Sequence, residues 1–564
     1  MENKNMKTNI LILIALFLTI NAFSQAPNWQ WAKSAGGSRY EYGQNNAVDI
    51  TGNTYVTGTF SSPSITFGSI TLINSDSIGY YDMYITKYDV SGNVVWARTA
   101  GGTAKNEEGK SVSTDASGNV YVTGVFESPS ITFGSITLIN ADSTGYYDMF
   151  VVKYDVNGNV IWAKRAGGIK DDYGYAIAVD GNGNSYITGT FFNSTITFGS
   201  ITLTNNGTNT SSDMFIVKYD TNGNVVWAKS AGGSVTADYG YGIALDANGN
   251  SYVTGDFGSP SITFGGTTLI NANPISPDMF IVKYDSIGTV IWAKSAGGNS
   301  YDHGNGIAVD GSGNSYVTGS FQSTSITFGG TTLINDSIGG GTYDMYVAKY
   351  DASGNFVWAN SAGGSNVDHG YGIAVDGSGN SYVVGYFHSL SITFGNTVLT
   401  KTGAYNMFIV KYDASGNVVW AKSVGGNAPN CANGIALDGS GNSYITGYFG
   451  PSSLTFGTTT LTFAGNCDIF VVKLNNLIGI EEMPEIAGFT ISPNPFTFAT
   501  TLTFNEPQKN TIIKITDVLG KEIKTINFTG KECVIEKGEM KTGVYFVEVI
   551  DENKNVVNRK LVVQ

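Results

Sequence analysis

Acidic side chains recur at one position of a long internal repeat, which makes them the first candidates for chemistry. The column consists of Glu41, Glu107, Asp172, Asp238, Asp302 and Asp368, with Asn430 in the seventh copy. If the copies form a ring, these side chains surround the mouth of its channel. Carboxylates there could bind sugar hydroxyls, a cation or a basic partner. Alternatively, each could accept a backbone N–H within its own loop, and recurrence in six copies favours that reading.

Two neighbouring columns differ from copy to copy. The first holds Tyr42, Glu108, Tyr173, Tyr239, His303, His369 and Cys431, and the second holds Gln44, Lys110, Tyr175, Tyr241, Asn305, Tyr371 and Asn433. Constant positions must support the shared scaffold, whereas variable positions are free to bind. We therefore predict ligand binding at Tyr173, Tyr175, Tyr239, Tyr241, His303, His369 and Tyr371.

Residues suited to catalysis are sparse. The only histidines are His303, His369 and His388. The first two share a column and could share a ligand, but two histidines make a weak metal site. No Gly-x-Ser-x-Gly motif of a hydrolase occurs, although two column acids could support glycoside hydrolysis or a lyase reaction. We expect binding without catalysis and without a cofactor, and we leave calcium binding and any metal site open.

The repeat that positions these residues has a period of about 65 residues. Trp-Ala recurs at Trp31, Trp96, Trp162, Trp227, Trp292, Trp358 and Trp420. In the third copy, residues 177–180, 185–191, 213–220 and 225–228 read as four antiparallel strands, and the variable columns precede the first of them as a loop. Four strands at this period indicate a β-propeller blade.

The first copy begins one strand out of phase. Residues 29–37 supply the Trp strand that is missing after residues 468–474. An N-terminal strand that completes the last blade would close the ring. The sequence therefore predicts an all-β fold, a seven-bladed β-propeller over residues 25–475.

Two features repeat in every copy and are read as scaffold. The turns follow the pattern Asp-x-x-Gly-Asn, in which Asp accepts local N–H groups and Gly takes the left-handed position. Calcium binding at these turns is less favoured because the spacing lacks a bidentate Glu. A tyrosine such as Tyr121 and a phenylalanine such as Phe133 also recur in each copy and are expected to pack between blades.

The cysteines and the N-terminus bear on the compartment. Cys431 and Cys467 fall in loops expected on one face of the last blade and could form a disulfide outside the cell, whereas Cys533 lies alone near the C-terminus. Residues 1–24 read as a signal peptide, with Lys4 and Lys7 before an apolar run and a small-x-small site. No segment is expected to span a membrane. The net charge of −14 without a basic stripe argues against nucleic acid and anionic membranes.

The repeats resemble the bacterial β-propeller repeat family called SBBP. The resemblance rests on Gly-Ile-Ala-Val-Asp at 306–310, Gly-Asn-Ser-Tyr-Val-Thr-Gly at 313–319 and Asp-Met-Phe-Ile-Val-Lys-Tyr-Asp at 278–285. It implies a propeller fold and carries no common catalytic set.

The C-terminal part differs from the repeats. Residues 476–488 read as a linker, and residues 489–564 as a small β-sandwich with strands near 501–504, 512–515, 544–549 and 560–563. Ser-Pro-Asn-Pro at 492–495, Asp-Val-Leu-Gly-Lys at 517–521 and Gly-Val-Tyr-Phe-Val at 543–547 resemble the C-terminal sorting domain of the type IX secretion system. The resemblance implies export through the periplasm to the medium or the outer cell surface, with the type IX machinery as a partner.

Together these observations favour an exported binding or adhesion propeller whose ligand is a glycan or a protein. The alternatives are a polysaccharide-active enzyme on the same scaffold and a structural surface component.

Overall fold

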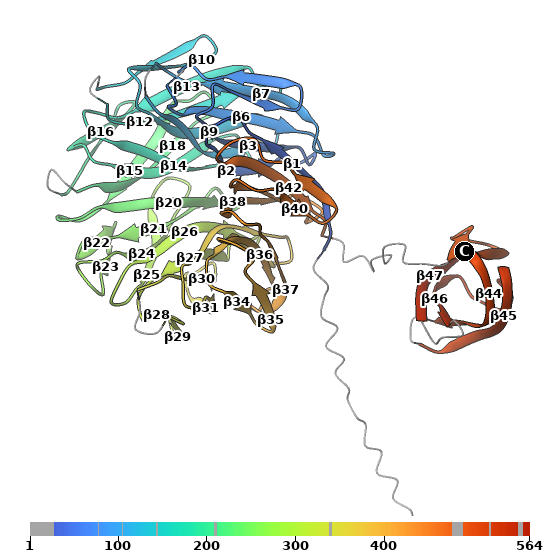
Figure 1. The fold of residues 1–564 in the computed structure, drawn as a ribbon. Coiled ribbons are helices and arrows are strands. Elements are labelled where there is room, and N and C mark those ends of the chain that lie inside the picture. Colours follow the sequence, from blue (N-terminus) through green and yellow to red (C-terminus); the bar gives the residue numbers. More distant parts are fainter. Residues whose placement is uncertain are drawn as a thin grey trace, which may run out of the picture. The chain divides into compact units, whose positions relative to one another are not determined.

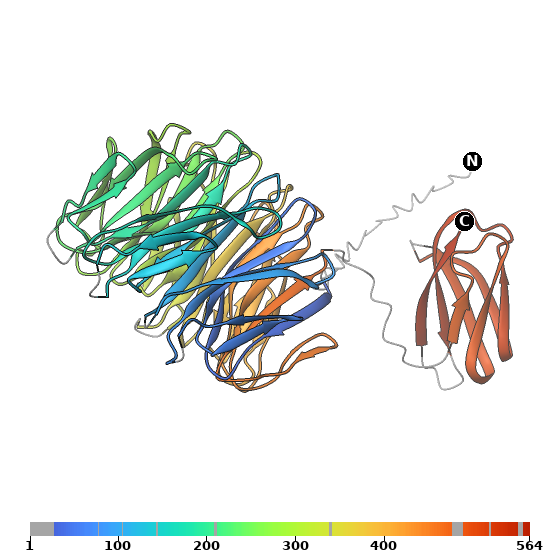
Figure 2. The same ribbon diagram turned by 90° about the horizontal axis from the view of Figure 1, so that it is seen from above.

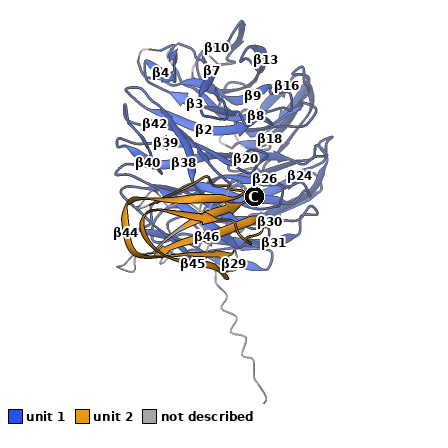
Figure 3. Ribbon diagram, turned by 90° about the vertical axis from the view of Figure 1, so that its right-hand side faces the viewer, with its two compact units in different colours: residues 1–478 blue, residues 479–564 orange. Residues whose placement is uncertain are grey.

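The computed structural model describes residues 27–76, 78–103, 105–142, 145–207, 211–337, 341–476, 489–517, 520–550 and 556–564. The predicted signal peptide, residues 1–24, lies outside the described residues, as does the predicted linker after residue 476. The chain forms two compact units, residues 1–478 and 479–564 (Figure 3). The described ranges contain strands and turns and no helix.

The described strands of the first unit form seven antiparallel sheets of four strands and seven short hairpins. We call the four strands of a sheet inner, second, third and outer. The inner strands are β2 (Glu41–Val48), β8 (Glu107–Thr114), β14 (Asp172–Val179), β20 (Asp238–Leu245), β26 (Asp302–Val309), β32 (Asp368–Val375) and β38 (Asn430–Leu437). The second strands are β3 (Thr54–Phe60), β9 (Val120–Phe126), β15 (Ser185–Phe191), β21 (Ser251–Phe257), β27 (Ser315–Phe321), β33 (Ser381–Phe387) and β39 (Ser443–Phe449).

The third strands are β6 (Asp82–Tyr88), β12 (Asp148–Tyr154), β18 (Asp213–Tyr219), β24 (Asp278–Tyr284), β30 (Asp344–Tyr350), β36 (Asn406–Tyr412) and β42 (Asp468–Leu474). The outer strands are β7 (Val94–Ala100), β13 (Val160–Ala166), β19 (Val225–Ala231), β25 (Val290–Ala296), β31 (Phe356–Ala362), β37 (Val418–Val424) and β1 (Trp29–Ala35). A hairpin lies between the second and third strands of each sheet. The hairpins are β4–β5 (Ser64–Phe67, Ile70–Ile73), β10–β11 (Ser130–Phe133, Ile136–Ile139), β16–β17 (Thr195–Phe198, Ile201–Thr204), β22–β23 (Ser261–Phe264, Thr267–Ile270), β28–β29 (Ser325–Phe328, Thr331–Ile334), β34–β35 (Ser391–Phe394, Thr397–Thr400) and β40–β41 (Leu454–Phe456, Thr459–Leu461).

The sheets lie side by side around a common centre (Figures 1 and 2). Each inner strand contacts the inner strands of two neighbouring sheets, in the order β2, β8, β14, β20, β26, β32, β38 and back to β2. The sheet of β38 contains an outer strand from the other end of the chain, because β1 pairs antiparallel with β42. The all-β prediction is confirmed, and the sheets are arranged as the blades of a β-propeller.

The inner strands begin earlier than the sequence predicted. In the third copy the ladder starts at Asp172, whereas a strand was expected only from residue 177. Gly174 made this stretch read as a loop, although the strand continues through it as a β-bulge. The variable columns therefore lie within the inner strands and not in a loop before them.

The turns are built as the Asp-x-x-Gly-Asn pattern predicted. Asp115 Oδ1 accepts the N–H groups of Ser117 and Asn119, each at 2.9 Å. Gly118 has φ of 78°, a left-handed conformation that a residue with a Cβ adopts only with strain. The Asp115 carboxylate is thus engaged within its own turn.

The hydrophobic core lies between neighbouring sheets. One cluster joins Tyr121, Trp162 and Val151 of the β8 sheet to Phe191 and Phe215 of the β14 sheet. Tyr121 and Trp162 are 0% and 7% exposed. This burial confirms that the repeated aromatic side chains pack between neighbouring sheets. Each such ring buries 150–250 Å² of its surface away from water.

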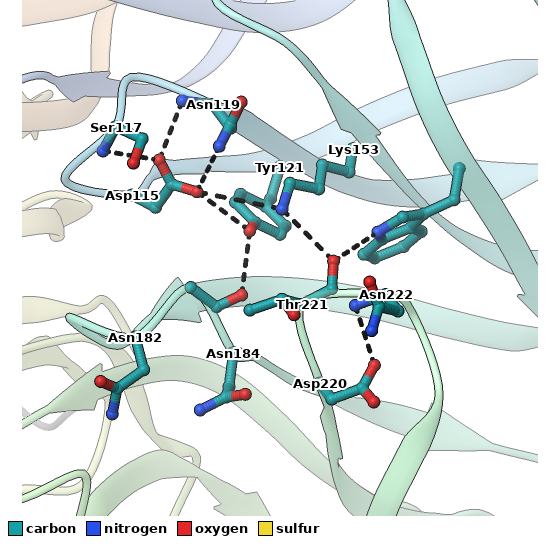
Figure 4. A network of polar contacts seen from close by, with 12 residues as sticks. Asp115, Ser117, Asn119, Tyr121, Lys153, Asn182, Asn184, Asp220, Thr221 and Asn222 are labelled. Atoms are coloured by element: carbon teal, nitrogen blue, oxygen red, sulfur yellow. Dashed lines mark hydrogen bonds and ion pairs between the residues drawn. The ribbon is translucent and has the colours of Figure 1, made fainter.

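Polar bonds cross the same interface (Figure 4). Tyr121 Oη donates to Asp115 Oδ2 at 3.1 Å and lies 2.9 Å from the Gly183 carbonyl oxygen of the next sheet. Lys153 Nζ lies 4.8 Å from the centre of the Tyr121 ring and donates to the Thr221 carbonyl at 3.3 Å. Trp162 Nε1 donates to the same carbonyl at 3.0 Å. Two carbonyl groups of one sheet are therefore held by side chains of the sheet before it.

The predicted disulfide is absent, because Cys431 and Cys467 are free, buried thiols. Cys431 pairs across the ladder with Tyr448 of β39, and β39 pairs in turn with β42, which begins one residue after Cys467. A whole strand separates the two cysteines, so their Cα atoms are about 10 Å apart, beyond the reach of a disulfide. The Cys431 thiol instead donates to Asn433 Oδ1 at 3.1 Å.

The second unit is one hydrogen-bonded sheet of five strands around its own core. These are β43 (Phe489–Ser492), β44 (Ala499–Asp517), β45 (Glu522–Glu536), β46 (Gly543–Ile550) and β47 (Val556–Val563). The first part of β44 pairs with β43 and its last part with β46, while β45 pairs along both parts. The long strand β44 therefore links the two halves that the sequence suggested as separate layers, and Leu502, Ile513, Val547 and Leu561 are buried between them.

Replacing Tyr121 with Phe should lower the free energy of unfolding by about 1–3 kcal/mol, because Asp115 and the Gly183 carbonyl would lose a buried partner. Chemical denaturation of the full chain measures the change. Tyr146→Phe is the matched control, since Tyr146 is 44% exposed. Equal stabilities of the two variants would show that the cross-sheet bond contributes nothing.

Candidate functional site

A cavity of about 760 Å³ lies where the inner strands meet. All seven inner strands contribute to its lining, and Tyr81 and Tyr448 add aromatic rings from other strands and loops. Glu108 and Lys110 are the charged side chains among the described lining residues, and they pair with each other at 2.5 Å. The cavity wall is therefore mainly aromatic, amide and aliphatic.

One residue of each inner strand is an extra residue in the ladder. In β14, Gly174 pairs with Gly189 and Ala176 with Thr188, which leaves Tyr175 without a partner. The equivalent residues are Gln44, Lys110, Tyr241, Asn305, Tyr371 and Asn433. A bulge redirects the side chain of its extra residue, and all seven side chains line the cavity. The second variable column of the sequence is thus the bulge column.

A glycine in the second strand makes each bulge possible. A Cβ on Gly189 would lie 1.8 Å from the Tyr173 carbonyl oxygen, and a Cβ on Gly255 would meet Tyr239 in the same way. Any side chain there would push the two strands apart. The Gly of the repeated Thr-Gly or Val-Gly step therefore lets the inner strand bend and direct its bulged residue into the cavity.

Tyrosines of β14 and β20 form one continuous group, which we call the tyrosine cluster. Tyr173 stacks on Tyr175 with ring centres 5.4 Å apart and 3° between planes, and Tyr239 stacks on Tyr241 at 5.4 Å. The two pairs meet through Tyr175 and Tyr241 at 5.3 Å. The structure thus brings four predicted site residues together, two of which line the cavity while the other two support them.

The remaining predicted residues form a second aromatic group. His369 stacks on Tyr371 with ring centres 5.5 Å apart. Tyr343 contacts both His369, at 4.9 Å, and His303, at 5.7 Å. Tyr371 lines the cavity, whereas neither histidine is part of the lining.

The two histidines have opposite electrostatic surroundings. Burial lowers the pKa of His303, but its hydrogen bond to the buried Asp256 outweighs this effect and raises the pKa above its usual value. His369 faces Ser320 Oγ at 2.7 Å instead, so burial and the nearby His303 lower its pKa to about 4. Near neutral pH, His303 is therefore the more cationic of the two.

The acidic column does not form a ring at the channel mouth, so this part of the prediction is wrong. Glu41, Glu107, Asp172, Asp238, Asp302 and Asp368 are all 0% exposed. Gly37 N donates to Glu41 at 2.9 Å, and Gly233 N donates to Asp238 at 2.8 Å. These acids accept backbone N–H groups from their own loops, which was the alternative left open by the sequence. Among the described residues, no group of three or more His, Cys, Asp or Glu side chains could hold a metal ion.

Sequence reasoning missed the residues that the second strands supply. Asp256 of β21 pairs with His303 of the next sheet, and Tyr386 of β33 lies 5.4 Å from His369. Tyr448 of β39 packs on Tyr42 at 5.0 Å. Each of the three precedes the phenylalanine that ends its strand, at a position occupied by Thr59 in the first sheet and Val125 in the second. Variation at that position was the available signal.

Replacing Asp256 with Asn should lower the pKa of His303 while leaving His369 largely unprotonated above about pH 5. NMR titration of the histidine ring protons in the full chain measures both values. His388 is the internal reference, because it lies outside this group of contacts with Asp256. A His303 pKa that stays the same in the variant would contradict the pairing.

The comparisons with known proteins match both units. The family description Beta-propeller repeat matches residues 161–190, 226–256, 291–320 and 358–386, and Secretion system C-terminal sorting domain matches residues 490–564. A WD repeat-containing protein of Acanthamoeba polyphaga mimivirus, described as uncharacterized, is 26% identical over 506 residues, which are 76% of this chain and 36% of that protein. The regulatory protein FlaEY of Caulobacter vibrioides is 26% identical over 343 residues, 52% of this chain and 34% of that protein. The chain spans about a third of the length of these relatives.

Two solved structures are similar at low scores. Sqt1 from Chaetomium thermophilum has a TM-score of 0.37 and 8% identity, covering 80% of this chain and 99% of that one. PorZ, a surface component of the type IX secretion system of Porphyromonas gingivalis, has a TM-score of 0.22 and 11% identity, covering 94% of this chain and 100% of that one.

Within the described residues, no helix is long and apolar enough to cross a membrane. The sorting domain directs the protein through type IX secretion to the cell surface or the medium. The chain is a β-propeller protein of SBBP-type repeats that ends in a type IX secretion C-terminal sorting domain.

Proposed function

We propose that this protein is an exported binding module, a seven-bladed propeller closed by its N-terminal strand, whose ligand occupies the central cavity. The observation that carries the proposal is the bulge column. Seven sheets share one scaffold, yet the side chains that they direct into the same cavity are of four kinds: Gln, Lys, Tyr and Asn. Variation at a position that points into a shared cavity is what a recognition site requires.

The chemistry of the lining favours an uncharged, hydroxyl-rich ligand such as a neutral glycan. Tyr175, Tyr241 and Tyr371 offer ring faces and hydroxyl groups, and Gln44 offers an amide. Aromatic faces with a few polar groups are typical of small-molecule sites. Glu108 and Lys110 neutralise each other, so the lining has no uncompensated charge to attract an ion. A protein segment rich in hydroxyl and amide groups is the other ligand that this lining suits.

A polysaccharide-active enzyme is less favoured than the sequence alone allowed. The column acids that could have served as acid and base are buried in their loops, away from the cavity lining. A purely structural role at the cell surface is the remaining alternative. It requires no ligand, and it gives no reason for the bulge residues to differ from sheet to sheet.

The Tyr175→Ala, Tyr241→Ala and Tyr371→Ala variants should each weaken ligand binding about tenfold or more, because each removes an aromatic surface from the cavity. A glycan and polysaccharide screen of the full chain, with and without calcium, identifies the ligand, and titration calorimetry measures the loss. Tyr146→Ala, outside the cavity, is the matched control and should bind normally. Release of reducing sugar would favour the enzyme, and no binding in any condition would favour the structural role.

Deleting residues 480–564 should leave the protein in the periplasm, because the sorting domain would be missing. Fractionation of the producing cells, with resistance to protease as the check that the propeller has folded, measures the outcome. Fusing residues 480–564 to an unrelated periplasmic protein is the converse experiment. A truncated, folded chain that reaches the medium as efficiently as the full chain would refute this role of the tail.

A further inference from the structure

Two buried acidic side chains lie near each other at each of six passages from one sheet to the next. One acid opens the third strand of a sheet and the other opens the inner strand of the following sheet. The pairs are Asp82–Glu107, Asp148–Asp172, Asp213–Asp238, Asp278–Asp302, Asp344–Asp368 and Asp468–Glu41. All twelve side chains are buried, with at most 2% of their surface exposed. We call each such place an acid seam.

The seam of Asp213 and Asp238 shows how closely the two residues approach. Asp238 N donates to the carbonyl oxygen of Ser212, the residue directly before Asp213, at 2.9 Å. The Thr190 hydroxyl oxygen lies 3.2 Å from the Asp213 carbonyl oxygen and 3.0 Å from that of Asp238. Backbone bonds equivalent to the first one occur at the other five seams.

Both carboxyl groups of this seam also lie against one Gly-Gly step. Gly233 N donates to Asp238 Oδ2 at 2.8 Å. A Cβ on the preceding Gly232 would lie 2.1 Å from Asp213 Oδ1. The two acids therefore lie against a single dipeptide that has no side chains of its own.

One oxygen in this seam lacks a hydrogen-bond partner. Asp213 Oδ2 accepts from Asn206 N at 3.0 Å, but the buried Oδ1 accepts from no described group. The equivalent Oδ1 atoms of Asp148, Asp278, Asp344 and Asp468 are also unpartnered. A buried acceptor without a donor costs free energy, and two adjacent buried negative charges cost more.

A metal cation does not account for this arrangement. Asp238 accepts from Gly233 N and from both N and Oγ of Ser259, so hydrogen-bond donors surround it. Calcium needs six to eight oxygen ligands, and no group of three acidic or other metal-binding side chains occurs among the described residues. None of the ion pairs between described residues includes Asp213 or Asp238.

The seventh passage indicates what the seam requires. Both acids are replaced there at once, by Asn406 and Asn430. A pair of amides is uncharged. Asn406 Nδ2 donates to Thr402 Oγ1 at 3.3 Å and Asn430 Nδ2 donates to the Ala428 carbonyl at 2.8 Å. An acid beside a carboxylate resembles this pair in avoiding two adjacent negative charges, since one proton removes one of them. We propose that the Asp213–Asp238 seam, and the seams that like it have an unpartnered Oδ1 and no basic partner, retain one proton on one of their two carboxyl groups, so that the contact between sheets depends on protonation.

The pKa values agree with this geometry. Burial, and the neighbouring Asp213 among lesser causes, raises the pKa of Asp238 to about 7, and burial raises that of Asp213 to about 6. Tyr239 is the other titratable group beside this seam. The remaining seams have additional neighbours, namely Asp76 at Asp82, Arg165 and Asp142 at Asp148, Asp171 at Asp172, His303 at Asp302, Asp336 at Asp344, and Cys467 at Asp468 and Glu41.

The direction of the pH dependence follows from the raised pKa values. An unfolded Asp has a pKa of about 3.9, so between about pH 4 and the folded pKa the native chain holds protons that the unfolded chain has released. The stabilisation is complete below about pH 4 and is lost as the pH rises through about 6–8. Each proton changes the unfolding equilibrium about tenfold per pH unit over that interval.

Thermal unfolding of the full chain at about pH 5 and about pH 8 tests the proposal. The wild-type midpoint should be lower at the higher pH. N406D/N430D adds a seventh acid seam and should show a larger decrease, whereas D213N/D238N converts one seam to the amide pair and should show a smaller one. The two double variants exchange pairs that the chain itself already uses, so they are matched controls for each other.

Three results would overturn the proposal. One is the same pH dependence in the wild type and in N406D/N430D. Another is a calcium-dependent rise of the midpoint at the higher pH, abolished by chelator, because that would assign the seams to a cation. The third is an N406D/N430D chain that is unfolded even at the lower pH, because the seam then does not tolerate a retained proton.

Discussion

The contact between one sheet and the next is the interaction on which the rest of this structure depends. A four-stranded sheet alone buries too little apolar surface to be stable. The aromatic cluster that Tyr121 and Trp162 form with Phe215 buries the faces of two sheets at once. Because every sheet needs two neighbours, the series is stable only when its last member meets its first, and the pairing of β1 with β42 completes that last sheet.

The central cavity is a consequence of the same arrangement. Inner strands that converge on a centre must leave space there, and each bulge turns one side chain into that space. The acid seams lie elsewhere, at the places where one sheet passes into the next, and their acids are not among the cavity-lining residues. Cavity-lining residues and the acids of the seams are therefore neighbours in sequence, as Tyr241 and Asp238 are, yet they lie in different parts of the fold.

Much of the fold could be predicted because each copy of the repeat carries the same strand and turn signals. The Trp spacing, the Asp-x-x-Gly-Asn turns and the alternating strands recur with few exceptions from copy to copy, and the sheets follow them. The start of the inner strand was not predictable from Gly174, because glycine reads equally as a loop and as a bulge. The buried state of Asp172 was equally hidden, since recurrence indicates a shared role but not its location. The disulfide prediction failed because loop positions do not reveal that β39 separates Cys431 from Cys467.

The site was predicted in part, and its limits have a physical cause. Tyr175, Tyr241 and Tyr371 were found because residues at that position vary within one strand type. Asp256 was missed because its contact with His303 crosses from one sheet to the next, 47 residues along the chain. Patterns within a copy describe a sheet well, whereas contacts between copies depend on how the sheets are placed.

The bulge has an evolutionary consequence. Its residue takes no part in the ladder, so replacing it alters the cavity without removing a hydrogen bond of the ladder. These positions can then diverge while the ladders that carry them stay the same. A chain built this way can change the chemistry of its cavity through a few substitutions while its fold is kept.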